Sequence, residues 1–181
     1  WGTNPCCEIG LRPNQFCNLT EINADDVHSQ EELNARAKAA AFIGTLQAGY
    51  TDFHYLRPVW REATELDALI GVGITGIGSG AILGLDLEQA AEVVKAVNAN
   101  IAQLIGINPA ARTSTVKPAG TTSLVLGSAS GIHAWHAPFY IRRVRVGKNE
   151  AIYQYLAKHH PELVEDEAFR PNEQAVIGVP Q

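Results

Sequence analysis

The stretch Leu66–Ile77, LDALIGVGITGI, consists almost entirely of apolar, β-branched and glycine residues. Such a run is typical of a strand buried on both faces, as in a parallel sheet covered by helices. The letters Gly71–Gly76 also match a dinucleotide-binding fingerprint. However, the next helix starts only near Asp86, and no acidic residue follows a second strand about 20 positions further on. We therefore predict a buried strand whose glycines permit close packing or a bend.

Helices are predicted on both sides of this strand. Ser29–Glu32 is a capping box, and the helix that it opens runs to about Ala48, where Gly49 can stop it. Asp86 caps a second, amphipathic helix that ends at Gly106. Further along the chain we expect strands at 112–117, 140–146 and 174–179 and a helix at 149–158. Strands that alternate with helices predict an α/β fold with a parallel sheet or barrel.

Composition and charge narrow the class of protein. The chain is 46% hydrophobic and 18% charged, as in ordinary globular domains, and its net charge of -5 argues against a broad basic surface for nucleic acid. No window approaches the roughly 18 apolar residues of a membrane span, and no basic-then-apolar leader opens the chain. We therefore expect a cytoplasmic protein that binds neither nucleic acid nor membrane. Because methionine is absent, we also expect a fragment or a processed piece.

The three cysteines, Cys6, Cys7 and Cys17, all lie in the first 17 residues. A disulfide scaffold would have its cysteines spread along the chain, so this clustering favours reactive cysteines over structural disulfides. Adjacent cysteines followed by a long gap lack the CxxC knuckle of a zinc site. His133 and His136 have a spacing that suits a metal, but no third ligand lies nearby in the sequence. No metal site is predicted.

Residues 1–24 are predicted to form a loop with short extended pieces, and the motif Asn4-Pro-Cys-Cys-Glu8 stands near its start. If the segment is extended, side chains alternate, and Asn4, Cys6 and Glu8 share one face while Cys7 points away. A carboxylate beside a thiol can move a proton while the sulfur does other work. The alternative is a cluster of buried, unreactive cysteines.

A second motif, KPAGTTS at Lys117–Ser123, follows a predicted strand. Its small residues expose backbone N–H groups, and its threonines and serine add hydroxyl donors. Such a nest suits a phosphate group, although a plain connecting loop would have a similar composition.

These motifs, in this order, resemble ribonucleotide reductases, the radical enzymes that make deoxyribonucleotides. Asn4–Glu8 is similar to the family's Asn-x-Cys-x-Glu finger loop, FCNLTEIN at Phe16–Asn23 to the segment with a reducing cysteine, and Lys117–Ser123 to the substrate-phosphate loop. The following GSASGIHAWHAPFYIRRVRV resembles the adenosylcobalamin-dependent, class II branch. The resemblance implies part of a ten-stranded α/β barrel with a central finger loop. Residues 1–181 would be its carboxy-terminal portion, with the finger loop and redox-cysteine strand in 1–24 and the phosphate loop in 117–123.

The resemblance also implies a role for each matching residue. Cys6 would become the thiyl radical that takes the ribose 3′ hydrogen, Glu8 would accept the 3′-hydroxyl proton, and Asn4 would bind the ribose hydroxyls. Cys17 would be one of the two thiols that reduce the substrate. The nucleotide phosphates would be held by Pro118, Ala119, Gly120, Thr121, Thr122 and Ser123.

The implied cofactor is adenosylcobalamin, and the implied substrate is a ribonucleoside triphosphate or diphosphate. A thioredoxin-like reductant and the amino-terminal half of the same barrel, which supplies the thiol partner of Cys17, are the expected partners. Without that half the chain should be inactive. Cys7 departs from the family pattern, which usually has a small residue without a thiol there, and it is either incidental or an unwanted disulfide partner.

Two other readings stay open. The chain could belong to the large subunit of a metal-dependent class I reductase, which shares the finger loop but receives its radical from a partner subunit. It could instead be a non-catalytic fragment that binds nucleotides or another protein. A glycyl-radical reductase fits the motifs poorly.

Overall fold

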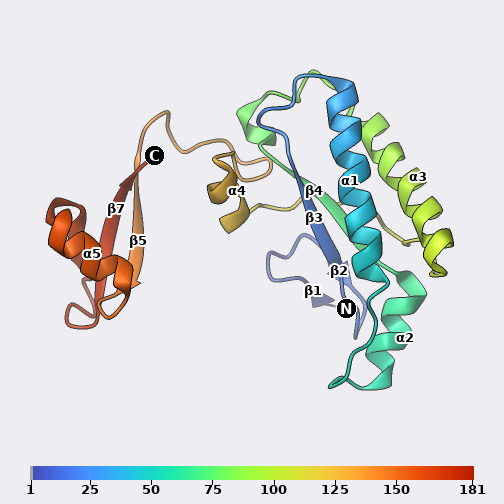
Figure 1. Ribbon diagram of the computed structural model, residues 1–181, viewed down its shortest axis with the longest axis horizontal. Helices are drawn as coiled ribbons and strands as arrows, with labels where there is room; N and C mark the ends of the chain where they lie inside the picture. The colour runs from blue at the N-terminus through green and yellow to red at the C-terminus, as the bar shows by residue number, and fades with distance from the viewer. Residues whose placement is uncertain (1) are drawn as a thin grey trace. The chain divides into compact units, whose positions relative to one another are not determined.

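The computed structural model describes residues 2–181, and the chain divides between Trp135 and His136 into two compact units (Figure 1). The first unit contains the finger-loop motif, the parallel strands and the phosphate-loop motif. The second unit is an antiparallel sheet with one helix. Both units combine helices with sheet, so the predicted α/β class is correct.

The centre of the first unit is a parallel pair of strands, β3 (Asn18–Asn23) and β4 (Ile70–Thr75). A short antiparallel hairpin, β1 (Gly2–Thr3) with β2 (Gly10–Leu11), precedes them. An extended segment continues the sheet beyond β4, because Val72 N donates to Thr113 O at 2.9 Å and Thr115 N donates to Val72 O at 3.1 Å. This segment was predicted as a strand, but it forms only an isolated parallel bridge.

Helices α1 (Gln30–Ala48) and α3 (Leu87–Ile105) lie along the sheet, as Figure 1 shows, and α1 packs against both β3 and α3. Both begin as predicted, since Ser29 Oγ accepts from Glu32 N at 3.2 Å and Asp86 Oδ1 accepts from Gln89 N at 2.9 Å. Side chains from both helices and both strands form one core, whose largest fully buried members include Leu33, Ile70 and Ile82.

The remaining helices of the first unit were not predicted. Helix α2 (Pro58–Asp67) includes Leu66 and Asp67, the first two residues of the stretch that was predicted as a buried strand. The helix ends at Ala68, which has a left-handed φ of 41°. Helix α4 (Thr121–Leu126) turns the second half of the phosphate-loop motif into a short helix, and η1 (Ile77–Ser79) is a single 3₁₀ turn. Arg57, at the start of α2, makes no side-chain cap, and Pro58 at the first helical position is the one start signal that the sequence offers there.

The second unit has strand order β5 (Ile141–Gly147), β7 (Gln174–Pro180) and β6 (Val164–Asp166), with β7 antiparallel to both neighbours. Helix α5 (Ala151–His159) and the turn η2 (Pro161–Leu163) connect β5 to β6. Strands β5 and β7 and helix α5 were predicted near their observed bounds, whereas β6 was not predicted, and a parallel arrangement is wrong here. The short connection from β6 to β7 has no room for the crossover that parallel neighbours require.

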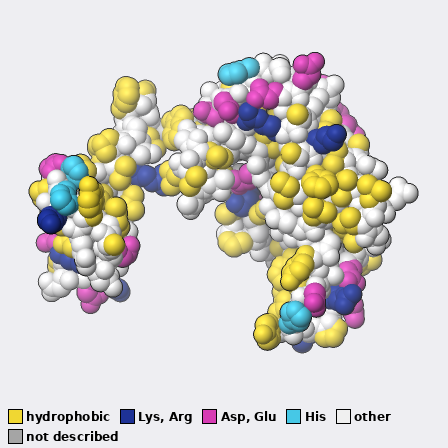
Figure 2. Space-filling model, viewed as in Figure 1, with side chains coloured by type: hydrophobic (Ala, Val, Ile, Leu, Met, Phe, Trp, Pro, Cys, Tyr) yellow, Lys and Arg dark blue, Asp and Glu magenta, His cyan; other side chains and the backbone are white. Residues whose placement is uncertain are grey.

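The first unit has an unpaired strand side and an exposed apolar helix surface among the described residues. Strand β3 pairs with β4 on one side and has no second partner strand among residues 2–181. Helix α1 exposes Phe42, Ile43 and Leu46, and hydrophobic side chains gather over this helix in Figure 2. The described residues form no closed barrel. They also include no helix that is both long and apolar enough to span a bilayer.

Candidate functional site

The Asn4–Glu8 motif forms the tight loop of the β1–β2 hairpin. Cys7 N donates to Asn4 O at 3.0 Å, and Cys7 takes a left-handed φ of 65°. Asn4 Nδ2 donates to Glu8 Oε1, and Asn4 Oδ1 accepts from Ile9 N at 3.0 Å. The predicted loop is confirmed, but the extended backbone that would place Asn4, Cys6 and Glu8 on one face is not present, because Asn-Pro favours a turn. Asn4 and Glu8 do meet, but through that turn and not through the alternation of a strand.

Both thiols of the loop are accessible. Cys6 and Cys7 are exposed, and Thr3 Oγ1 lies 3.6 Å from Cys7 Sγ as a weak donor. Cys7 does not sit on the far face of a strand, as had been expected, but in the turn itself. The radical-cysteine candidate therefore has its sulfur in the open part of the hairpin.

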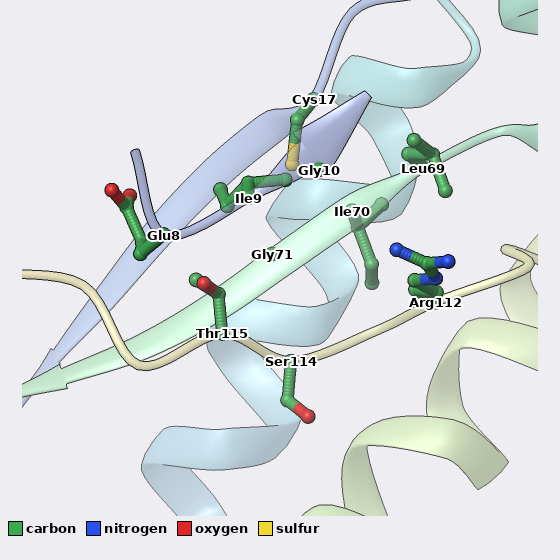
Figure 3. Close-up of a pocket in the computed structure, with 10 residues that line it drawn as sticks. All are labelled: Glu8, Ile9, Gly10, Cys17, Leu69, Ile70, Gly71, Arg112, Ser114 and Thr115. Atoms are coloured by element: carbon green, nitrogen blue, oxygen red, sulfur yellow. The ribbon is translucent and has the colours of Figure 1, made fainter. Parts of the chain in front are cut away.

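Glu8 and Cys17 line one small cavity of about 100 Å³ (Figure 3). Glu8 enters it from the hairpin, and Cys17 enters from the residue just before β3. Figure 3 shows the Cys17 sulfur directed towards β4, with Arg112 and Thr115 contributed by the extended segment beyond that strand. The sequence motifs Asn4–Glu8 and Phe16–Asn23 thus meet in space.

The cavity changes the acidity of Cys17. Partial burial raises the pKa of this thiol above its ordinary value, and the nearby carboxylate of Glu8 raises the pKa further. Both effects disfavour the thiolate. Cys17 is therefore a protonated thiol at neutral pH, a form that can donate a hydrogen but is a poor nucleophile.

This pKa shift predicts slow alkylation of Cys17. In the folded chain, iodoacetamide should modify Cys17 more slowly than in the urea-unfolded chain at the same pH, because only the thiolate reacts. The difference should shrink as the pH rises through the raised pKa, and Glu8→Gln should move the rate profile to lower pH. Mass spectrometry of the Cys17 peptide over a pH series measures this. Equal rates in folded and unfolded chain near neutral pH would contradict the shift.

The glycines of the fingerprint-like stretch make room for this thiol. A Cβ atom added at Gly71 would lie 2.6 Å from Leu19 Cδ2 and 3.3 Å from Cys17 Sγ. Close packing, the predicted role of these glycines, is therefore confirmed. The same clearance lets Cys17 and Leu19 turn across β4 into the cavity face of the sheet.

A polar anchor fixes the hairpin beside this cavity. Gln15 is buried, its Nε2 donates to Asp67 Oδ2, and its Oε1 accepts from Arg12 N at 2.7 Å. Arg12 also lies 3.6 Å from Asp67. These contacts attach the hairpin to the end of α2, which directly precedes β4, so Glu8 and Cys17 share one rigid frame.

The motif Lys117–Ser123 is braced from within. The carbonyl of Ala119 accepts hydrogen bonds from Ser123 Oγ at 2.6 Å and Ser130 Oγ at 2.7 Å. Ser123 is buried, so its hydroxyl serves the loop backbone. The exposed Thr121 and Thr122 hydroxyls, and the amides of Gly120 and Thr121, donate no hydrogen bond within residues 2–181. These donors are available to a ligand.

The structure does not bring every candidate to one place. Cys6 and Pro118–Ser123 are not among the residues that line the Glu8–Cys17 cavity. His133 is exposed and its Nδ1 lies 3.0 Å from Ser130 O. No group of three or more His, Cys, Asp or Glu side chains in residues 2–181 is arranged to hold a metal.

Sequence reasoning missed several cavity residues. Arg112, Ser114 and Thr115 line the cavity, yet they carry no motif that distinguishes them from an ordinary strand. The one sequence feature that could have indicated them is their position a few residues before the phosphate-loop motif. The ion pair between Glu21 and Lys117 was missed as well.

The fold corresponds to that of a known structure. The chain aligns over 99% of its length with 29% of the chain in a crystal structure of the B12-dependent, class II ribonucleotide reductase, with a TM-score of 0.77 and 22% identity. The chain therefore has the fold of a segment of that reductase structure.

The relatives found by sequence are named for their cofactor and their substrate. The chain is 27% identical, over 99% of its length, to the adenosylcobalamin-dependent ribonucleoside-triphosphate reductase of Euglena gracilis, and 28% identical, over 86%, to that of Lactobacillus acidophilus. It spans 25% of the length of each of these relatives. No family model matches the chain. The resemblance to ribonucleotide reductases, and among them to the adenosylcobalamin-dependent kind, is confirmed.

Proposed function

We propose that the chain carries the radical-cysteine and reducing-cysteine portion of an adenosylcobalamin-dependent ribonucleoside-triphosphate reductase. The observation that carries this proposal is the cavity shared by Glu8 and Cys17, beside a hairpin that presents Cys6. Relatives named for this activity match most of the chain. The reaction replaces the ribose 2′-hydroxyl by hydrogen, releases water and oxidises two thiols to a disulfide.

Each residue of the site then has a defined task. Glu8, held by Asn4, accepts the proton of the 3′-hydroxyl, and the buried Glu8 Oε2, which lacks a hydrogen-bond partner within residues 2–181, is free to receive it. Asn4 orients Glu8 and the ribose hydroxyls. Cys17 supplies hydrogen from its protonated thiol, and a second thiol, which we place in the amino-terminal part of the same barrel, completes the pair.

Adenosylcobalamin, when bound, supplies the radical chemistry that ordinary side chains cannot start unaided. The exposed position of Cys6 fits such a cofactor, because its sulfur is open to a radical source outside the hairpin. Cys6 then takes the ribose 3′ hydrogen and returns it at the end of the reaction. After each turnover, a thioredoxin-like dithiol would reduce the disulfide that Cys17 has formed.

The nucleotide phosphates are assigned to Pro118–Ser123. Ser123 and Ser130 hold the Ala119 carbonyl, while the donors of Gly120, Thr121 and Thr122 are available. This division of hydrogen bonds gives the loop a rigid backbone with donors directed to an anion.

The rest of the barrel is part of the proposal. The unpaired side of β3 and the exposed apolar side chains of α1 support further chain packed against this unit. The relatives, about four times as long, supply a precedent. We propose that a ten-stranded barrel forms when that chain is present, and that residues 2–181 alone do not turn over substrate.

The first test is the cofactor requirement. The complete gene product that contains this sequence should form deoxynucleotides from ribonucleoside triphosphates only when adenosylcobalamin is added. The readout is chromatography of the products with a dithiol reductant present. Activity that requires a separate metal-containing subunit and ignores cobalamin would reassign the radical source to class I. Nucleotide binding without any activity would favour a non-catalytic role.

A further inference from the structure

Glu21 and Lys117 form an ion pair on the cavity side of the first unit. Glu21 Oε1 lies 3.8 Å from Lys117 Nζ, and the two side chains are only 15% and 21% exposed. Glu21 belongs to β3, and Lys117 directly precedes the phosphate loop. The pair therefore connects the strand that follows Cys17 with the loop assigned to the phosphates.

Neither member of the pair is fully bonded. A charge-assisted N–H···O bond is usually about 2.7–2.9 Å long, so a separation of 3.8 Å is an electrostatic contact and not a formed hydrogen bond. Lys117 Nζ has three donors, and within residues 2–181 it makes one long bond of 3.3 Å to Pro118 O. Glu21 Oε2 is buried and has no hydrogen-bond partner within the same residues. Buried groups of this kind call for an explanation.

The strand and the backbone around the pair are closely packed. Glu21 lies on the same face of β3 as Cys17, because the two are four residues apart, and its Cγ is 3.8 Å from a Cβ built on Gly73. The backbone of Lys117 is closely packed, since a Cβ built on Gly131 would lie 2.6 Å from Lys117 O. The ammonium group can change partner by rotating its side chain while the backbone stays in place.

We propose that Lys117 is a phosphate-binding residue of this loop, and that Glu21 acts through Lys117 by competing with the substrate for its ammonium group. The proposal rests on the assignment of the phosphate loop above. A loose ion pair is exchanged easily, because little bonding is lost when a polyphosphate takes the place of the carboxylate. Glu21 thereby lowers the affinity for triphosphate.

Lys117→Met tests the binding role. The ligands are CTP and cytidine, and the dissociation constants are measured by calorimetry on the complete gene product. Lys117→Met should weaken CTP binding at least tenfold, leave cytidine binding unchanged and reduce the dependence of CTP affinity on salt. Lys95→Met is the matched control, because Lys95 makes the same change of charge in an exposed ion pair on α3, and it should change neither constant.

Glu21→Gln tests the competition, and its expected effect is a gain in affinity for CTP. The variant should bind CTP several-fold more tightly, whereas Glu92→Gln, its matched control on α3, should not. Damage to the fold would not produce tighter binding. The double variant Glu21→Gln/Lys117→Met should bind CTP as weakly as Lys117→Met, because the competition disappears with the lysine.

The results separate this inference from the proposed function. If the parent protein binds CTP no more tightly than cytidine, the assigned phosphate loop fails. If it prefers CTP and Lys117→Met matches the parent, the role of Lys117 is overturned while the loop assignment survives. Weaker CTP binding by Glu21→Gln would overturn the competition between the carboxylate and phosphate.

Discussion

Replacing Cys6 by alanine is expected to abolish deoxynucleotide formation in the complete gene product, by at least about 10⁴-fold, the scale on which removal of a reacting group acts. Without the sulfur no thiyl radical can form, so the 3′ hydrogen of the ribose is never taken. Nucleotide binding should be preserved, because Cys6 is exposed and its side chain makes no hydrogen bond within residues 2–181. Product analysis and equilibrium binding of CTP check the two halves of this expectation.

Cys7→Ala is the matched control for Cys6→Ala. Cys7 is the adjacent residue, it is also exposed, and it carries the same functional group. It should retain most of the activity. Sustained product formation by Cys6→Ala, or loss of activity in Cys7→Ala alone, would move the radical assignment from one cysteine of the hairpin to the other.

Replacing Cys17 by serine should stop the enzyme after no more than one turnover. Serine keeps the shape of the half-buried side chain but supplies no hydrogen by oxidation to a disulfide, so the intermediate is left unreduced. The measurement is the amount of product per enzyme in the presence of excess dithiol reductant. The parent should continue for many cycles, whereas the variant should release less than one equivalent of deoxynucleotide.

Two comparisons make this result specific to Cys17. Cys7→Ser introduces the same change outside the cavity and should turn over repeatedly. In the parent, turnover without reductant should leave Cys17 in a disulfide that peptide mapping can detect. Multiple turnovers by Cys17→Ser would show that another thiol does the reducing, and Cys17 would then be a packing residue.

The starts of helices α1 and α3 could be predicted from the sequence, because each has a capping residue. Ser29 and Asp86 cap their helices with their own side chains, so both helix starts could be predicted from a few adjacent residues. Helix α2 lacks such a cap, and its last residues, Leu66 and Asp67, merge without a break into the apolar run of β4. The pattern alone could not divide that run between a helix and a strand.

The geometry of the site depended on contacts that are distant in sequence. The Asn4–Glu8 segment contained the correct residue types, but a non-glycine residue in the left-handed region, Cys7, was not foreseeable from composition. The hairpin is held by Gln15 on Asp67, 52 positions away. A similar separation joins Cys17 to the strand that it faces. The roles of the candidates came from family resemblance, and the cavity that joins two of them came from the structure.

Gly71 shows that a reactive centre can include a residue with no functional group. Any side chain at this position would fill the volume that Leu19 and Cys17 now occupy across β4. The space beside the Cys17 thiol is therefore set by the neighbouring strand, through the missing side chain of Gly71. An inventory of acids, bases and nucleophiles would pass over Gly71, although a side chain there would crowd both Leu19 and the thiol of Cys17.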